Sequence, residues 1–166
     1  APEGARPSSA GAVALSLRGD GAQYGFEMDT QGWTVRGPSA ERPFVSGAQA
    51  YAGTRSLGVR FNGAAGTASV SVPSPAVRGG RTVTFHVWLP EKSGLDSVQA
   101  YVQQGPQGRW RFTGTWRAVR NLQPGAWNTL TVSVPAEATS PLLELGVELR
   151  SRGGWRGTVH VDSVRW

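Results

Sequence analysis

The chain has 166 residues, of which 39% are hydrophobic and 17% are charged, and this balance suits one globular domain with its own core. It contains no cysteine, which excludes a disulfide framework, a thiolate metal site and a cysteine nucleophile. The formal net charge of +6 is an arginine effect, because Lys92 is the single lysine beside 16 arginines.

A basic chain raises the question of a nucleic-acid partner. The arginines, however, are spread through every segment of the sequence, and no basic run or nucleic-acid-binding motif occurs. No apolar stretch approaches the roughly 20 residues that a membrane span needs. We therefore expect neither a nucleic acid nor a membrane as a partner.

The predicted elements follow residues 1–11, whose Pro, Gly and Ser content is typical of a linker or a processed N-terminal segment. Residues 12–17 form a short apolar run that predicts an edge strand. Further strands are predicted at intervals of about 8–15 residues. In chain order they cover residues 24–27, 33–36, 42–45, 56–61, 68–72, 82–89, 97–103, 109–116, 128–134, 143–150 and 158–165.

Gly- and Pro-rich turns separate these runs, and none of them shows helical periodicity. The expected fold class is therefore all-β. It is a two-sheet antiparallel β-sandwich, or jelly roll, of about ten short strands with no significant helix. The sequence has no internal repeats, so we expect residues 12–166 to form a single domain.

Two strand-like segments near the ends of the chain each carry one acid among apolar residues. The first is Tyr-Gly-Phe-Glu-Met-Asp at 24–29, which contains Glu27, and the last is Val-His-Val-Asp-Ser-Val at 159–164, which contains Asp162. A buried charge is costly unless it is paired. We expect the two segments to be neighbours, with their carboxylates either holding a cation or pairing with arginines.

Alternate side chains of a strand point to opposite faces, so each strand divides into core residues and face residues. Neighbouring strands lie about 4.8 Å apart, and we expect three strands to form one solvent-facing surface. Aromatic rings stack on the apolar faces of sugars, and amide, carboxylate and guanidinium groups hydrogen-bond sugar hydroxyls. The surface therefore indicates carbohydrate binding, with Gly146 leaving room for a sugar ring. Its candidate ligand-binding residues are His86, Trp88, Gln99, Tyr101, Gln103, Glu148 and Arg150, with Thr84 and Glu144 beside them.

Seven tryptophans are more than a core of this size needs. Trp110, Trp116 and Trp155 lie in Gly- and Arg-rich stretches, and each is a candidate either for ligand contact or for capping an end of the core. The tryptophans that flank turns or lead strands are expected in the core; these are Trp33, Trp127 and Trp166.

The two end segments, Gly-Thr-Arg-Ser-Leu at 53–57 and Gly-Ala-Trp-Asn-Thr-Leu at 125–130 together carry a resemblance to a known family. They resemble the β-sandwich carbohydrate-binding modules, of galactose-binding-like jelly-roll fold, that are appended to bacterial mannanases, xylanases and β-glucanases. Residues 110–116 resemble the segment that walls the groove in this family. The resemblance implies one structural calcium, held by Glu27, Asp162 and backbone carbonyls near Thr54 and Arg55.

The resemblance also implies a function. The chain would be a secreted, monomeric module that binds a β-linked polysaccharide (mannan or glucomannan, xylan, or β-glucan) in a concave groove. It would thereby target a covalently attached catalytic domain to its substrate. The basic charge is a departure from many such modules. Because arginine pairs with carboxylates through two parallel hydrogen bonds, an anionic polysaccharide, uronate-containing or sulfated, is an alternative ligand.

Two further alternatives come from other functional classes. The sandwich could be a structural or adhesion spacer, or a polysaccharide lyase that uses Tyr101, His86 and Arg150. Glycoside hydrolysis needs two carboxyl groups about 5–9.5 Å apart, whereas Glu144 and Glu148 are separated by about 13 Å of strand. We therefore expect no enzymatic activity.

Overall fold

The structure, a computed structural model, describes residues 21–166. The linker expected at 1–11 and the edge strand expected at 12–17 lie outside these residues. Eleven strands form two antiparallel sheets in the described part of the chain, which confirms the expected sandwich. Within residues 21–166 the helical segments are two short 3₁₀ turns, η2 (Pro106–Gly108) and η3 (Val119–Asn121). No helix between residues 21 and 166 has the length and apolarity that a membrane crossing requires.

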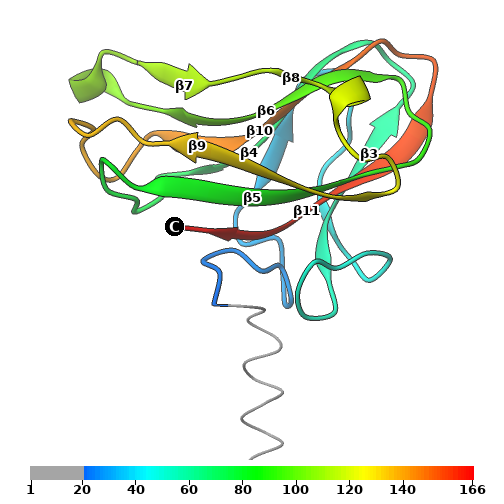
Figure 1. The fold of residues 1–166 in the computed structure, drawn as a ribbon, viewed down its shortest axis with the longest axis horizontal. Coiled ribbons are helices and arrows are strands. Elements are labelled where there is room, and N and C mark those ends of the chain that lie inside the picture. The colour runs from blue at the N-terminus through cyan, green and yellow to red at the C-terminus, as the bar shows by residue number, and fades with distance from the viewer. Residues whose placement is uncertain (1–20) are drawn as a thin grey trace, which may run out of the picture.

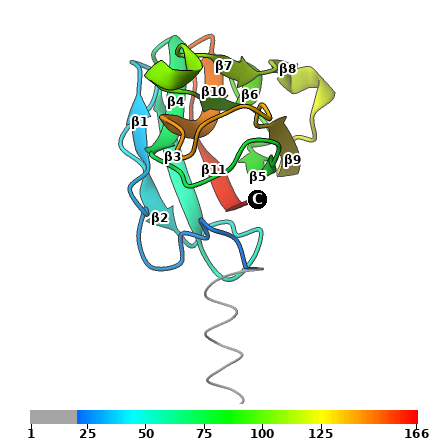
Figure 2. The same ribbon diagram turned by 90° about the vertical axis from the view of Figure 1, so that its left-hand side faces the viewer.

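Strands that follow one another in the sequence are often not neighbours within a sheet (Figures 1 and 2). The first sheet contains, in spatial order, β1 (Thr34–Arg36), β4 (Gly66–Pro73), β10 (Glu144–Ser151), β6 (Leu95–Gln103) and β7 (Phe112–Gly114), and β8 (Arg117–Ala118) also pairs with β6. The second contains β2 (Phe44–Ser46), β3 (Ser56–Asn62), β11 (Arg156–Arg165), β5 (Thr82–Leu89) and β9 (Ala126–Ser133). In Figure 1 the layer with β6, β7 and β8 lies above β5 and β11.

The core lies between the two sheets and is built from the alternate apolar residues that the sequence pattern marks. In β5 these are Val83, Phe85, Val87 and Leu89, all buried, and in β10 they are Leu145, Val147 and Leu149. Full burial of such a side chain contributes about 1.5–3 kcal/mol relative to exposure. This repeated burial fixes which face of each strand remains outside, and so positions the candidate site.

Consecutive strands β5 and β6 belong to different sheets. The expectation that residues 82–89 share a surface with residues 97–103 and 143–150 is therefore wrong. Strand alternation reveals which residues of β5 point outward but not which sheet the strand joins, because both sheets pack on the same core. Thr84, His86 and Trp88 point outward from the second sheet, on the opposite side of the molecule from β6 and β10.

The two ends of the described chain are neighbours, as expected. Tyr24 forms an antiparallel bridge with Val164, and the two backbone hydrogen bonds between them measure 3.1 and 3.0 Å. Phe26 and Ser163 adopt positive φ angles of 57° and 51°, which residues other than glycine rarely adopt. These two bends directly adjoin Glu27 and Asp162.

Candidate functional site

The outer face of the first sheet brings together the face residues expected on two strands. β6 and β10 are adjacent and antiparallel, and their register sets Gln99 opposite Glu148, Tyr101 opposite Gly146, and Gln103 opposite Glu144. The sequence alternation thus correctly predicted which side chains of β6 and β10 share one side of the sheet. We call it the polar face, defined by the outward side chains of β1, β4, β10, β6 and β7.

Glu144 is held at the polar face by two neighbours. The guanidinium of Arg36 donates two hydrogen bonds to its carboxylate, at 3.1 and 2.8 Å, and the Tyr101 hydroxyl donates a third. Burial alone would raise the pKa of the Glu144 carboxyl, but the hydrogen bonds from Arg36 and Tyr101 outweigh burial and hold it below its usual value. The charge of this carboxylate is therefore neutralised and its orientation is fixed.

Glu148 is fixed without a cation. The Ser69 hydroxyl donates to one carboxylate oxygen at 2.6 Å, and the Gln99 amide donates to the other at 2.8 Å. Gln99 is 4% exposed, so its amide serves mainly to orient Glu148. A carboxylate with both oxygens oriented still has lone pairs that can accept hydrogen bonds from sugar hydroxyls.

An aromatic ring pair lies beside these carboxylates. The Phe112 ring stacks on the Tyr101 ring, with centroids 4.9 Å apart and planes 14° from parallel. Tyr101 is 2% exposed and Phe112 is 43% exposed. Tyr101, expected as a sugar platform, is therefore the support beneath the ring that faces solvent. Phe112 was missed by the sequence analysis, although it shares the alternation of Trp110 and Trp116 within residues 109–116.

Further apolar groups are exposed at the same end of the face. Trp110 and Leu143 are 58% and 40% exposed. The side-chain amide of Gln103 donates a hydrogen bond to the backbone carbonyl of Trp110. The backbone amide of Leu143 donates to the backbone carbonyl of Gln103 at 3.0 Å. Trp110 has a positive φ of 59°, a strained conformation of the kind that clusters at functional loops. Gln103 thus positions the Trp110 loop through its amide nitrogen.

The other end of the polar face carries Trp116 and Arg150. The Arg150 guanidinium lies over the Trp116 ring, 4.4 Å from its centroid. Such a pair leaves the edge of the guanidinium free to donate hydrogen bonds while the ring screens one of its sides. Both residues are expected at the ligand surface, and the structure places them in contact with each other.

Gly146 lies in the middle of the polar face, and its missing side chain has a structural cause. A Cβ atom at this position would lie 2.3 Å from the carbonyl oxygen of Val70 on β4. The close approach of β10 to β4 therefore demands glycine. Gly146 is expected to leave room for a sugar ring, and the contact with β4 is by itself a sufficient reason for glycine at this position.

Three expected ligand residues lie away from the polar face. His86 and Trp88 are on the second sheet; His86 is 1% exposed and its Nδ1 lies 3.0 Å from the Ser163 carbonyl oxygen. Trp155 stacks on Phe61, with centroids 5.0 Å apart, and caps an end of the core. The lyase constellation is wrong as well, because Tyr101 and His86 belong to different sheets.

The tryptophans assigned to the core follow the expectation to different degrees. Trp33 is 2% exposed and packs edge-on against Phe26. Trp127 and Trp166 are half-buried, so each has one side in contact with solvent.

Glu27 and Asp162 are buried near each other. Burial raises the pKa of Asp162 to about 7, and the charge of Glu27 adds to this rise. The three ion pairs between described side chains include neither carboxylate. Backbone amides of the 47–55 loop stabilise both instead: those of Tyr51 and Ala52 donate to Asp162, and those of Thr54 and Arg55 donate to Glu27.

Two buried carboxylates fit a hard cation such as calcium in charge and in ligand type. They supply two of the six to eight oxygen ligands that calcium takes, and no group of three or more acidic or histidine side chains gathers within residues 21–166. The remaining ligands would be neutral oxygens, such as backbone carbonyls, a hydroxyl or water. The backbone amides of Thr54 and Arg55 and the Thr54 hydroxyl donate to Glu27, so this segment already lies against that carboxylate.

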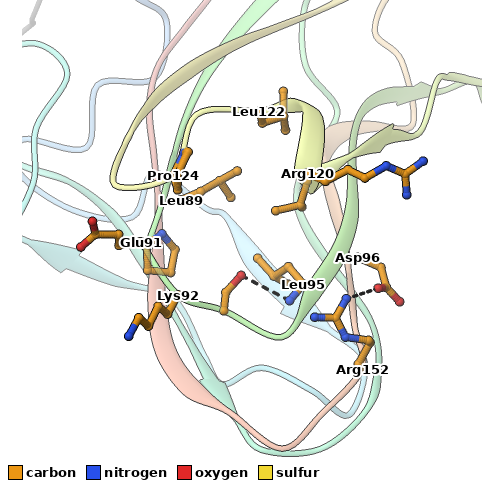
Figure 3. Close-up of a pocket in the computed structure, with 12 residues that line it drawn as sticks. Leu89, Glu91, Lys92, Leu95, Asp96, Arg120, Leu122, Pro124 and Arg152 are labelled. Atoms are coloured by element: carbon orange, nitrogen blue, oxygen red, sulfur yellow. Dashed lines mark hydrogen bonds and ion pairs between the residues drawn. The ribbon is translucent and has the colours of Figure 1, made fainter.

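A pocket of about 490 Å³ lies beside the start of β6 and the η3 turn (Figure 3). Leu89, Leu95 and Leu122 form its apolar lining. The Arg152–Asp96 ion pair lies at its edge, and Arg120 extends away from it. The pocket has no aromatic side chain on which a sugar could stack, and we do not assign the carbohydrate site to it.

No protein-family model and no curated protein matches the sequence. Solved structures do share its fold. One, which explains the promiscuous specificity of carbohydrate-binding modules of the β-sandwich superfamily, is 24% identical and matches 89% of this chain with a TM-score of 0.79. This chain spans 62% of the length of that one.

Two other structures extend the comparison. A carbohydrate-binding module of the CBM28 type, specific for non-crystalline cellulose, is 20% identical, with a TM-score of 0.61 over 86% of this chain and 91% of that one. The CBM22-1 and GH10 modules of endo-1,4-β-D-xylanase 10B from Clostridium thermocellum, solved with xylohexaose, are 15% identical. They match 85% of this chain and 27% of that one, with a TM-score of 0.59. This chain therefore has the fold of the β-sandwich carbohydrate-binding modules.

Proposed function

We propose that this chain is a non-catalytic carbohydrate-binding module that binds a β-linked polysaccharide on the polar face. The stacked pair of Phe112 on Tyr101 carries the proposal. It presents a rigid exposed ring beside two carboxylates, Glu144 and Glu148, whose orientations are fixed before any ligand arrives. Ring and acceptors together match a pyranose, which has an apolar C–H face and a rim of hydroxyls.

The charge of the polar face favours a neutral mannan, glucomannan, xylan or β-glucan. Arg36 and Glu144 neutralise each other, and Glu148 and Arg150, two positions apart on β10, carry opposite charges. An anionic polysaccharide would have to rely on the guanidinium edge of Arg150 and on arginines outside the ring pair. Such binding would weaken strongly with added salt, whereas stacking is nearly indifferent to salt.

We propose further that the module acts outside the cell as a monomer and targets a covalently attached catalytic domain to polysaccharide. The support is similarity of fold to a module that shares one chain with a GH10 module. Targeting requires no catalytic residue in this chain. Both carboxylates of the polar face are committed to internal hydrogen bonds, as a static recognition surface requires.

We also propose a structural calcium at Glu27 and Asp162, completed by backbone carbonyls near Thr54 and Arg55. The positive φ angles of Phe26 and Ser163 support it, because strained bends beside both carboxylates indicate that their positions matter. A bound cation would offset the repulsion between two buried negative charges. Thermal unfolding in calcium chloride and in EDTA tests this proposal, and equal melting temperatures would count against it.

Native affinity electrophoresis tests the proposed function. The protein is run through gels containing glucomannan, xylan, mixed-linkage β-glucan, polygalacturonate or alginate, each with and without added salt. We expect retardation by at least one neutral glycan that survives the salt. Retardation by the uronates alone, abolished by salt, would transfer the function to anionic polysaccharides. Migration unchanged in every gel would favour a structural or adhesion spacer.

A further inference from the structure

A second stacked ring pair lies on the outer face of the second sheet, on the side of the sandwich opposite the polar face. The Tyr51 ring lies parallel to the His86 imidazole, with centroids 3.6 Å apart and planes at 15°. Tyr51 is 43% exposed and His86 is 1% exposed. Phe112 on Tyr101 has the same construction: an exposed ring, also 43% exposed, on a buried polar ring.

The Tyr51 ring is held in place by the backbone of its own loop. The Tyr51 amide donates to the buried carboxylate of Asp162 at 2.9 Å, and the Ala52 amide donates to the same oxygen at 3.2 Å. Three residues later, the Thr54 amide and hydroxyl donate to Glu27. A ring fixed before binding loses little conformational entropy when a ligand stacks on it.

The surroundings of Tyr51 suit a sugar rather than a purely apolar partner. Trp127 on β9 meets the Tyr51 ring edge-on, with centroids 5.8 Å apart, and lies opposite Trp88 in the strand register. Both tryptophans are half-buried. Thr129 and Thr131 follow on the same face of β9, and both are exposed. Aromatic surface beside free hydroxyls offers stacking and hydrogen bonding within one patch.

We infer that Tyr51 and Trp127 form a second carbohydrate-binding surface, which takes a separate stretch of the same class of polysaccharide as the polar face. The inference rests on the proposed function for the class of ligand. Because the two surfaces lie on opposite faces, one glycan segment cannot occupy both. A module with both surfaces would bind long polysaccharide with avidity and would cross-link separate chains.

Indole N–H resonances of ¹⁵N-labelled protein report on the two surfaces separately, because Trp127 belongs to one and Trp116 to the other. Titration with xylohexaose, mannohexaose and cellohexaose, with assignments from Trp127→Phe and Trp116→Phe, is expected to shift both resonances saturably. Tyr51→Ala should raise the dissociation constant reported by Trp127 about tenfold and leave that reported by Trp116 within a factor of about two. Phe112→Ala should do the reverse, and the ring-preserving Tyr51→Phe should behave like the wild type.

Three outcomes would overturn the inference. If Trp116 shifts and Trp127 does not, the second surface does not exist, and the proposed function stands. If Phe112→Ala abolishes the shift of Trp127, that shift is transmitted from the polar face. If no indole shifts with any of the three hexasaccharides, the second surface fails together with the proposed function for these ligands. Matching ¹⁵N spectra outside the substituted region show that each variant is folded.

Discussion

The two outer faces of the sandwich treat their carboxylates differently. On the polar face, Glu144 and Glu148 are oriented by side chains, among them the 58% exposed Arg36, and they remain within reach of solvent. On the opposite face, Asp162 and Glu27 are buried and oriented by backbone amides of the 47–55 loop. The first arrangement presents charge to a ligand, whereas the second uses charge to fasten a loop.

The largest effect is expected where a buried carboxylate fastens the loop. Asp162→Ala leaves the amides of Tyr51, Ala52 and Ser163 without their acceptor. Because buried donors without partners are costly, we expect a loss of about 3 kcal/mol in the free energy of unfolding, or roughly 6–12 °C in melting temperature. Denaturant and thermal unfolding measure this loss.

Asp29→Ala is the matched control for this experiment. Asp29 is exposed, and its carboxylate accepts one backbone hydrogen bond, from Gln31 at 2.9 Å. We expect its substitution to cost about 0.5 kcal/mol or less. If Asp162→Ala were no more destabilising than Asp29→Ala, the loop would not depend on the buried carboxylate.

The next effect separates ligand binding from stability. Trp116→Ala removes the ring beneath the Arg150 guanidinium. Loss of this stacking surface should weaken glycan binding about tenfold, or 1.4 kcal/mol, while the melting temperature changes little, because Trp116 is only half-buried. Isothermal titration calorimetry gives the affinity. Unchanged affinity would remove this end of the polar face from the binding surface.

A smaller effect comes from the exposed ion pair. Glu144→Gln removes the charge that pairs with Arg36, and we expect a loss of about 0.5–1 kcal/mol at pH 7, since the arginine is largely exposed to solvent. The pKa of Glu144 is lower in the folded protein than its usual value, so its contribution is present above the pKa of the unfolded chain. It is lost as the pH falls through the folded pKa.

The stability difference between wild type and Glu144→Gln should therefore shrink as the pH falls below about 4.5. Urea unfolding from pH 7 to pH 3 follows this difference. A difference that is independent of pH would show that the ion pair does not carry the effect.

The smallest effect tests whether the ligand is neutral or anionic. Arg150→Gln removes the positive charge over Trp116. For a neutral glycan, we expect binding to retain its weak dependence on salt and to lose a few-fold in affinity, through one hydrogen-bonding group. Affinity measured at 50 and 500 mM salt shows the contrast. A steep salt dependence in the wild type that vanishes in the variant would indicate an anionic ligand.

Alternation in the sequence predicts the fold class and the outward residues of β6 and β10, because successive side chains of a strand point to opposite faces. It placed His86 and Trp88 wrongly because alternation is the same in either sheet, and strand partners are set by contacts between distant segments. The packing of Trp155 could not be predicted for the same reason: its partner Phe61 lies 94 positions away in the sequence, and no local pattern indicates the contact.

The ring pair shows a second limit of sequence reasoning. The alternation of Trp110, Phe112 and Trp116 could have indicated that Phe112 faces outward. No local signal, however, indicates that its ring covers Tyr101 and turns an expected platform into a support. Which ring is exposed and which is covered depends on packing between side chains of different strands.

In the proposed site, the exposed ring of Phe112 binds the polysaccharide. The most direct measurement compares wild type, Phe112→Ala and Met28→Ala by calorimetric titration with the glycan that retards the wild type in native gels. Met28 is the matched control, because its side chain is apolar, 79% exposed and outside both sheets. We predict that Phe112→Ala lowers the affinity at least about tenfold and that Met28→Ala leaves it unchanged. Equal affinities for wild type and Phe112→Ala would contradict the assignment of the binding site to the polar face.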